Sequence, residues 1–229
     1  MEKKYIMTID QGTTGTRVIL FNHDGGMHST AYREIRQIYP NPGWVEHDPL
    51  EYWNTTMECA AEAFAKGGVE AAEIAAIGIT CQRETTVMWD KDTGIPVYNA
   101  IVWQSRQTAG LCEDLKARGY EKTVREKTGL VIDAYFSGTK IKWIIDNVPG
   151  VRERIAQGKI CMGNIDSWLI WKLSGGAFHV EDYSNASRTM LLNINTLEWD
   201  QELLDALDIP AQILPRLKPS SGIMAVTSR

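Results

Sequence analysis

Residues 5–17 read YIMTIDQGTTGTR, a β-rich run that ends on an acidic residue and continues into a Gly/Thr turn. Farther on, Asp24-Gly25 marks a hairpin, because glycine tolerates the positive φ that such turns require. The chain should therefore open as an antiparallel β-meander, with strands predicted at residues 5–10, 16–21 and 27–36.

The next segment predicts one amphipathic helix and one buried strand. Asp48 is a good helix N-cap, with Pro49 at the first helical position. The spacing after it predicts an apolar stripe that faces the core, formed by Leu50, Trp53, Met57, Ala60 and Phe64. Residues 74–81 (IAAIGITC) are apolar on both faces, which is typical of a central parallel strand covered on both sides.

Helices and short strands alternate in the rest of the chain. Strands are predicted at 86–89, 97–103 and 160–163, and helices at about 104–118, 120–127, 137–147, 151–157, 166–173 and 201–207. The tail from Pro219 to Arg229 has no periodicity. This order predicts a single α/β domain over 1–229, whose mixed sheet opens in the meander and is flanked by helices.

The composition is that of an ordinary globular protein. Hydrophobic residues make up 44% and charged residues 23% of the 229 residues, and the net charge is −5. The basic residues are scattered, so no nucleic acid is expected as a partner. No apolar run is long enough for a membrane span. The four cysteines lack metal or redox spacing, which indicates free thiols and a cytoplasmic protein.

The Gly/Thr turn is the first candidate site. Glycine lets backbone N–H groups approach phosphate closely, threonine hydroxyls add donors, and Arg17 adds a permanent charge. Asp10 can hold Mg²⁺ through water, since this ion takes one or two carboxylates and keeps several waters. The alternative is an ordinary polar hairpin turn, and the residues alone do not decide between the two.

A second candidate site combines two charges and two aromatic rings. Arg83 and Glu84 follow the strand predicted at 74–81, at the edge where open α/β sheets bind ligands. A guanidinium donates and a carboxylate accepts, so the pair suits polyol hydroxyls, although a surface ion pair is the alternative. Trp103 can pack on the carbon backbone of a polyol or in the core. Tyr135 can donate to a ligand hydroxyl or to a backbone partner.

A series of motifs then resembles a known family. Residues 10–17 resemble the phosphate-binding signature of the FGGY carbohydrate kinases. Seven further segments look like the glycerol kinases of that family in particular, and they occur in order along the chain: 43–49 (GWVEHDP), 78–80 (GIT), 82–86 (QRETT), 98–104 (YNAIVWQ), 128–130 (TGL), 135–140 (YFSGTK) and 185–190 (NASRTM).

The resemblance implies an actin-like (ribonuclease-H-like) domain, one of two that flank a catalytic cleft in an ATP:glycerol phosphotransferase. By this resemblance glycerol is bound by Arg83, Glu84, Trp103 and Tyr135. The phosphates of ATP or ADP face Gly12, Thr13, Thr14, Gly15 and Arg17, and Mg²⁺ lies near Asp10. Whether the full-length protein is a homo-oligomer is left open.

The resemblance also implies a missing part. Family members extend well beyond this length, and their catalytic base is an aspartate of the C-terminal domain, to which no residue here corresponds. We therefore expect an N-terminal half without a catalytic base, inactive by itself. Two alternatives remain: an FGGY kinase for another polyol or a ketose, and a non-catalytic binding module that kept the fold.

Overall fold

The computed structural model describes residues 3–228, and its backbone packing divides the chain into two compact units. Unit 1 comprises Met1–Gln37 and His47–Gln82, and unit 2 comprises Ile38–Glu46 and Arg83–Arg229. The chain therefore passes from one unit to the other after residues 37, 46 and 82. Residues 1, 2 and 229 of the predicted domain lie outside the described part.

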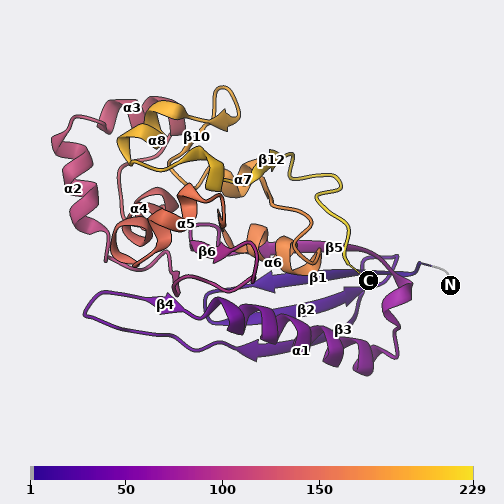
Figure 1. The fold of residues 1–229 in the computed structure, drawn as a ribbon. Helices are drawn as coiled ribbons and strands as arrows, with labels where there is room; N and C mark the ends of the chain where they lie inside the picture. Colours follow the sequence, from indigo (N-terminus) through magenta and orange to yellow (C-terminus); the bar gives the residue numbers. More distant parts are fainter. Residues whose placement is uncertain (1–2, 229) are drawn as a thin grey trace. The chain divides into compact units, whose positions relative to one another are not determined.

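Unit 1 is built on a four-stranded sheet in the order β3-β2-β1-β5 (Figure 1). β1 (Tyr5–Gln11), β2 (Gly15–Phe21) and β3 (Met27–Glu34) pair antiparallel in chain order, and β5 (Ile74–Cys81) pairs with β1 in parallel. The sheet is therefore mixed, as the sequence predicts. Gly25, with φ at 78°, lies in the turn between β2 and β3.

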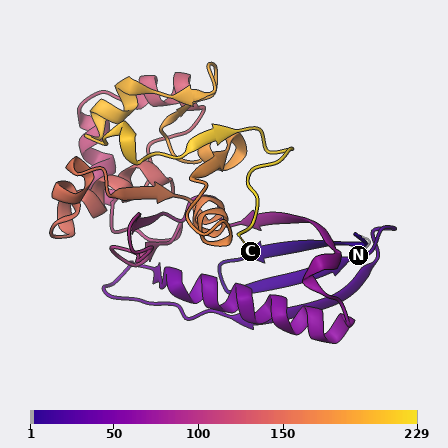
Figure 2. The ribbon, with the colours of Figure 1, turned by 45° about the vertical axis from the view of Figure 1, so that its right-hand side comes forward.

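A long helix covers part of this sheet. α1 (Pro49–Gly67) begins after the predicted N-cap, where the Asp48 carboxylate accepts a hydrogen bond from the Leu50 N–H at 2.9 Å. It lies along β2 and β3 in two views (Figures 1 and 2). The predicted apolar stripe is wrong at Leu50 and Met57, which are 38% and 45% exposed. Ala60 is buried as predicted, and beside it the helix buries Tyr52, Thr55, Thr56, Cys59 and Ala63.

Hydrogen bonds explain why the helix buries this other face. The Thr55 Oγ1 atom lies 2.7 Å from Thr16 Oγ1 in β2, and the Cys59 thiol donates to the Thr16 carbonyl at 3.5 Å. Ser29 of β3 donates from its hydroxyl to the Ala63 carbonyl at 2.8 Å. Small polar side chains thus bring helix and sheet together, and a pattern built only on apolar residues overlooks them.

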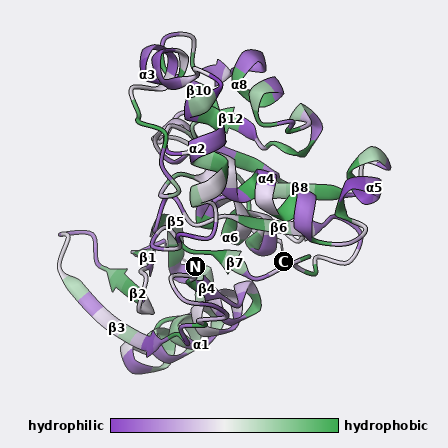
Figure 3. Ribbon diagram, turned by 90° about the vertical axis from the view of Figure 1, so that its left-hand side faces the viewer, coloured by the Kyte–Doolittle hydropathy of each residue, from purple (hydrophilic) through white to green (hydrophobic). Residues whose placement is uncertain are grey.

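The outer strands of the sheet are more open than the sequence predicts. β5 is parallel to β1 as expected, but Ala75, Ala76, Gly78 and Thr80 are exposed, so the prediction of a strand covered on both sides is wrong. An apolar composition allows burial of a strand but does not supply the element that covers it. β3, the other outer strand, carries mostly hydrophilic and neutral colours in Figure 3 and is largely exposed.

Unit 2 combines short helices with two-stranded sheets. β6 (Val87–Asp90) pairs antiparallel with β8 (Ile160–Gly163), β9 (Val180–Asp182) pairs parallel with β12 (Arg216–Lys218), and β10 (Leu192–Asn193) pairs antiparallel with β11 (Glu198–Trp199). β7 (Ala100–Ile101) pairs with β4 (Glu46–His47), whose first residue belongs to this unit. The helices are α2 (Ala109–Ala117), α3 (Glu121–Thr128), α4 (Ser137–Asn147), α5 (Val151–Ala156), α6 (Ile165–Leu173), α7 (Tyr183–Ala186) and α8 (Gln201–Ala206). Single 3-10 turns occur at Ala71–Glu73 in unit 1 and Ala211–Ile213 in unit 2.

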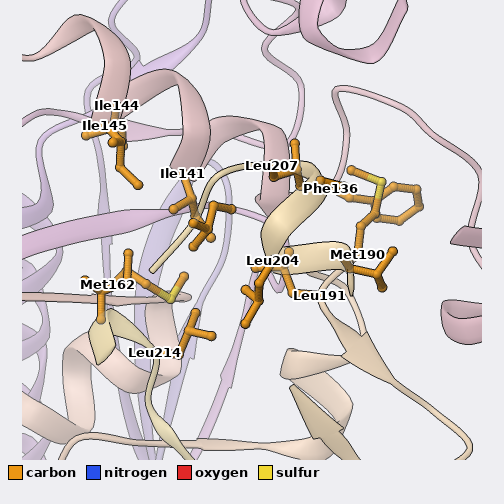
Figure 4. Close-up of a cluster of buried hydrophobic side chains, with 14 of the residues drawn as sticks. Phe136, Ile141, Ile144, Ile145, Met162, Met190, Leu191, Leu204, Leu207 and Leu214 are labelled. Atoms are coloured by element: carbon orange, nitrogen blue, oxygen red, sulfur yellow. The ribbon is translucent and has the colours of Figure 1, made fainter. Parts of the chain in front are cut away.

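An apolar core holds α4 in place within unit 2. Ile141 and Ile144 of α4 are fully buried, together with Met162 of β8 (Figure 4). Leu204 and Leu207, in and just after α8, belong to the same cluster. Full burial of one such side chain contributes about 1.5–3 kcal/mol, so this cluster fixes the helix whose first turns carry Ser137 to Lys140.

Sequence patterns locate the longer elements of unit 2 well and the short ones poorly. The strand predicted at 160–163 and the helix predicted at 137–147 coincide with β8 and α4. The helix predicted from residue 104 begins only at Ala109, because residues 104–108 form turns. The strands β9 to β12 were not predicted. None of the described helices has the length and apolar character needed to cross a bilayer.

Candidate active site

Glu84 is the centre of a buried cluster in unit 2. The residue is only 4% exposed, and its Oε1 accepts a hydrogen bond from Arg188 Nε at 2.7 Å. A buried carboxylate is destabilising unless a partner compensates its charge, and Arg188 supplies that compensation. The expected alternative, a surface ion pair at the strand end, is therefore wrong for Glu84. Arg83, its chain neighbour, is exposed.

Two aromatic rings of the predicted site lie beside this ion pair. The Trp103 and Tyr135 rings have centroids 5.5 Å apart and an interplanar angle of 59°. The backbone N–H of Trp103 donates at 3.3 Å to Oγ1 of Thr85, the residue that follows Glu84 in the chain. The Arg188 guanidinium lies 6.0 Å from the Tyr135 ring centroid and 4.9 Å from that of Phe136. Within unit 2 the structure therefore brings Glu84, Trp103 and Tyr135 together, and Arg188 bonds to Glu84 and lies near the Tyr135 ring.

Lys140 contacts the same cluster from the inside of the unit. It is completely buried, and its Nζ donates to the backbone carbonyls of Glu84 at 3.1 Å, Phe136 at 3.0 Å and Tyr135. Burial, which disfavours the charged form, lowers the pKa of Lys140 to about 7. No sequence pattern indicates a role for Lys140 or Arg188, although both lie in segments that carry the family resemblance.

The second candidate site is the turn between β1 and β2 in unit 1. The Gly12 N–H donates to the Gly15 carbonyl at 3.0 Å and closes the turn. The Thr13 carbonyl accepts from Gln37 Nε2 at 2.8 Å, and the Thr14 carbonyl accepts from the Ile35 N–H at 3.1 Å. The turn is thus anchored through its carbonyls, and Thr14 is exposed at its tip.

Charged residues flank this turn. Asp10 is half-buried at the end of β1 and lies opposite the exposed Arg17 of β2 in the antiparallel register. The Arg17 guanidinium lies 5.5 Å from the centroid of the Tyr32 ring. Gly15 is buried, and a Cβ at this position would collide with the Tyr32 ring. The packing of Tyr32 therefore gives Gly15 a structural role beside its predicted one.

A third group of buried titratable residues lies in α6 and β9. Asp166 and Glu181 are 4% and 0% exposed. Asn164 Nδ2 and Ser167 Oγ donate to the two oxygens of Glu181, each at 3.1 Å. Burial, reinforced by the nearby charge of Asp182, raises the pKa of Asp166 to about 7. Within residues 3–228 no three His, Cys, Asp or Glu side chains form a group that could hold a metal ion.

Comparison with known proteins adds relatives to this geometry. Glycerol kinases of Caldanaerobacter subterraneus subsp. tengcongensis and Carboxydothermus hydrogenoformans are 58% and 61% identical to the chain over 99% of its length. The crystal structure of Plasmodium falciparum glycerol kinase with ADP matches the whole chain with a TM-score of 0.92 and 33% identity. The chain spans about half of each relative: 46% and 45% of the two bacterial proteins and 46% of the solved chain.

The family model for the N-terminal domain of the FGGY family of carbohydrate kinases matches residues 5–229. That range includes both candidate sites, the turn at residues 12–15 and the cluster around Glu84. This chain therefore belongs to the FGGY family of carbohydrate kinases.

Proposed function

We propose that the chain is the N-terminal domain of an ATP-dependent glycerol kinase and that units 1 and 2 both belong to that domain. The observation that carries the proposal is the buried Glu84 carboxylate, held by Arg188 beside the Trp103–Tyr135 aromatic pair. The glycerol kinases that are 58–61% identical over nearly the whole chain support the choice of substrate.

In the proposed glycerol site, each side chain contacts a different part of the ligand. The rings of Trp103 and Tyr135 pack against the carbon backbone, and the Tyr135 hydroxyl donates to a glycerol oxygen. Glu84 accepts from a glycerol hydroxyl, and Arg83 donates to one. Hydrogen bonds to charged groups contribute roughly 1.5–3 kcal/mol each, so the two charged residues provide most of the discrimination for hydroxyls.

The proposed phosphate site is the turn of unit 1. Backbone N–H groups and hydroxyls of the turn, with Arg17, hold the ATP phosphates, through the residues Gly12, Thr13, Thr14, Gly15 and Arg17. Asp10 fits a Mg²⁺ ion held through water, because it is a half-buried single carboxylate and Mg²⁺ needs no more than one or two. The ion would neutralise charge on the phosphates when bound.

The proposed reaction is an in-line displacement at the γ-phosphorus. A terminal glycerol oxygen forms the new bond to phosphorus as the bond to the bridging oxygen breaks and ADP leaves with the electron pair. The hydroxyl proton passes to a carboxylate base that we place in the part of the relatives beyond this chain. Catalysis then depends mainly on positioning and charge stabilisation, which the two candidate sites supply.

A substrate panel tests this proposal. In the natural full-length protein we expect ADP formation that depends on glycerol, and Trp103→Ala and Arg83→Ala should each reduce kcat/KM for glycerol at least tenfold, about 1.4 kcal/mol. Arg118→Ala, which removes an exposed arginine at the end of α2, should leave it unchanged. Turnover of a ketose in preference to glycerol would indicate another FGGY kinase. Absence of turnover with every polyol and ketose would indicate a non-catalytic module.

A further inference from the structure

Among residues 3–228 no carboxylate binds the ammonium group of Lys140, and yet this lysine is 0% exposed. An ammonium group has three N–H donors, and burying it is unfavourable unless they are satisfied. Three backbone carbonyls accept them: Glu84, Tyr135 and Phe136. Lys140 therefore makes a full set of hydrogen bonds, all of them to main chain.

These carbonyls belong to the two segments that carry the proposed glycerol residues. Glu84 lies 56 residues before Lys140, and Tyr135 and Phe136 form the approach to α4. Arg188 fixes the Glu84 side chain from one direction, whereas Lys140 fixes its backbone from another. The hydroxyl of Ser137 adds a weaker bond to the same Glu84 carbonyl at 3.4 Å.

We propose that Lys140 is a positioning residue for the polyol substrate, which sets the Glu84 segment against the Tyr135 segment through their backbone carbonyls. This inference rests on the proposed function, since it concerns the same site. The lysine contacts the segments that hold the substrate and not the substrate itself. An uncharged, apolar side chain of similar length would fill the space but would remove the lysine donor from all three carbonyls.

The test compares Lys140→Met with Lys142→Met in the natural full-length protein. Lys142 lies on the same helix, is 20% exposed at its side chain and forms ion pairs with Asp146 and Asp208, so it controls for the loss of a lysine in α4. We expect Lys140→Met to raise the glycerol KM about tenfold or more, because displacement of the Glu84 and Tyr135 segments weakens the hydrogen bonds that hold glycerol. The KM for ATP should stay within about twofold, and Lys142→Met should change neither value.

The readout separates positioning from stability. A lysine that only stabilises the fold would reduce the amount of active enzyme, and hence the apparent kcat, at an unchanged glycerol KM. That result with folded Lys140→Met would overturn the inference. If Lys140→Met does not fold, Lys140→Gln, which supplies two N–H donors without the charge, should still raise the glycerol KM above that of the wild type, and an unchanged KM would overturn the inference. Failure of both variants to fold while Lys142→Met folds would also overturn it.

Wild-type protein without glycerol-dependent ADP formation would instead refute the proposed function, and the inference with it.

Discussion

Glu84 is held at two points. Arg188 donates to its side-chain carboxylate, and Lys140 donates to its backbone carbonyl. The Glu84–Arg188 ion pair is also enclosed, with side chains only 5% and 26% exposed. The ion pair between Arg152 and Asp146 has a similar distance, 2.8 Å, but side chains that are 49% and 32% exposed. Both pairs join an arginine to a carboxylate, so comparing them shows how burial changes the strength of such an ion pair.

A double-mutant cycle measures that difference. We expect Glu84→Gln and Arg188→Leu to show a coupling in unfolding free energy of about 1–3 kcal/mol, because removing one partner leaves the other charge buried. The cycle of Asp146→Asn with Arg152→Leu should give less than about 1 kcal/mol, since water screens exposed pairs. Urea denaturation of the 229-residue chain supplies both values. Equal couplings would show that burial does not strengthen the Glu84–Arg188 pair.

Gly15 offers a test of packing at the phosphate turn. Gly15→Ala should lower the unfolding free energy by about 1–3 kcal/mol, because the new methyl group meets the Tyr32 ring in β3. Gly110→Ala is the matched control, since a Cβ there has nothing within 4 Å and alanine suits the first turn of α2. Tyr32→Ala should remove most of the penalty of Gly15→Ala in the double variant. A Gly15→Ala chain as stable as the wild type would contradict the collision.

Among the elements, those with a periodic pattern were predictable and those defined by pairing were not. α4 and β8 follow from their residue patterns. β10 and β11 contain two residues each, too few for any periodicity, and they are defined only by their pairing with each other across the turn at residues 194–197. The same limit applies to the site. Glu84, Trp103 and Tyr135 were candidates from their own chemistry, and the resemblance assigned them to one site, whereas Arg188 reaches Glu84 across 104 residues and no local pattern indicates that contact.

Asp166, in the helix α6 that packs against β9, should make the unfolding free energy depend on pH. The pKa of Asp166 is raised from its ordinary 3.8 to about 7, so folding favours the neutral carboxyl. This contribution is fully present below pH 3.8 and is lost as the pH rises through about 7. Asp166→Asn should therefore lose less unfolding free energy between pH 4 and 8 than the wild type, roughly 1.4 kcal/mol for each unit of pKa difference.

Two histidines change the unfolding free energy with pH in the opposite direction to Asp166. They are present in both the wild type and Asp166→Asn, so their effect is the same in the two profiles. Burial lowers the pKa of His47 and of His179 to about 4, so their contribution is present above pH 6.5 and is lost as the pH falls through 4. The comparison is made by urea denaturation at a series of pH values. Asp205→Asn, at an exposed position of α8, should follow the wild-type profile. An Asp166→Asn profile parallel to that of the wild type would show that Asp166 ionises normally in the folded chain.

At the scale of the whole molecule, the 229-residue chain should fold but should not phosphorylate glycerol at an enzymatic rate. If the general base lies beyond this chain, as we propose, its absence alone lowers the rate by roughly 10²–10⁴. Glycerol should bind no better than about millimolar, a level worth about 4 kcal/mol. The assay is ADP release from ATP with glycerol and Mg²⁺, with Arg83→Ala as the control. Robust glycerol-dependent turnover that Arg83→Ala abolishes would place a base within these residues.

The repeated passage of the chain between its units affects the order in which the nascent protein can fold. Residues 38–46 belong to unit 2, where the Val45 carbonyl accepts from the Val102 N–H at 3.1 Å and the Glu46 carboxylate accepts from Tyr98 Oη at 2.8 Å. At synthesis rates of about 5–20 residues per second, these partners leave the ribosome roughly 3–10 s after Glu46. The strands and helix of unit 1 are complete by residue 82. During translation, unit 1 can therefore assemble before residues 38–46 have met their own partners in unit 2.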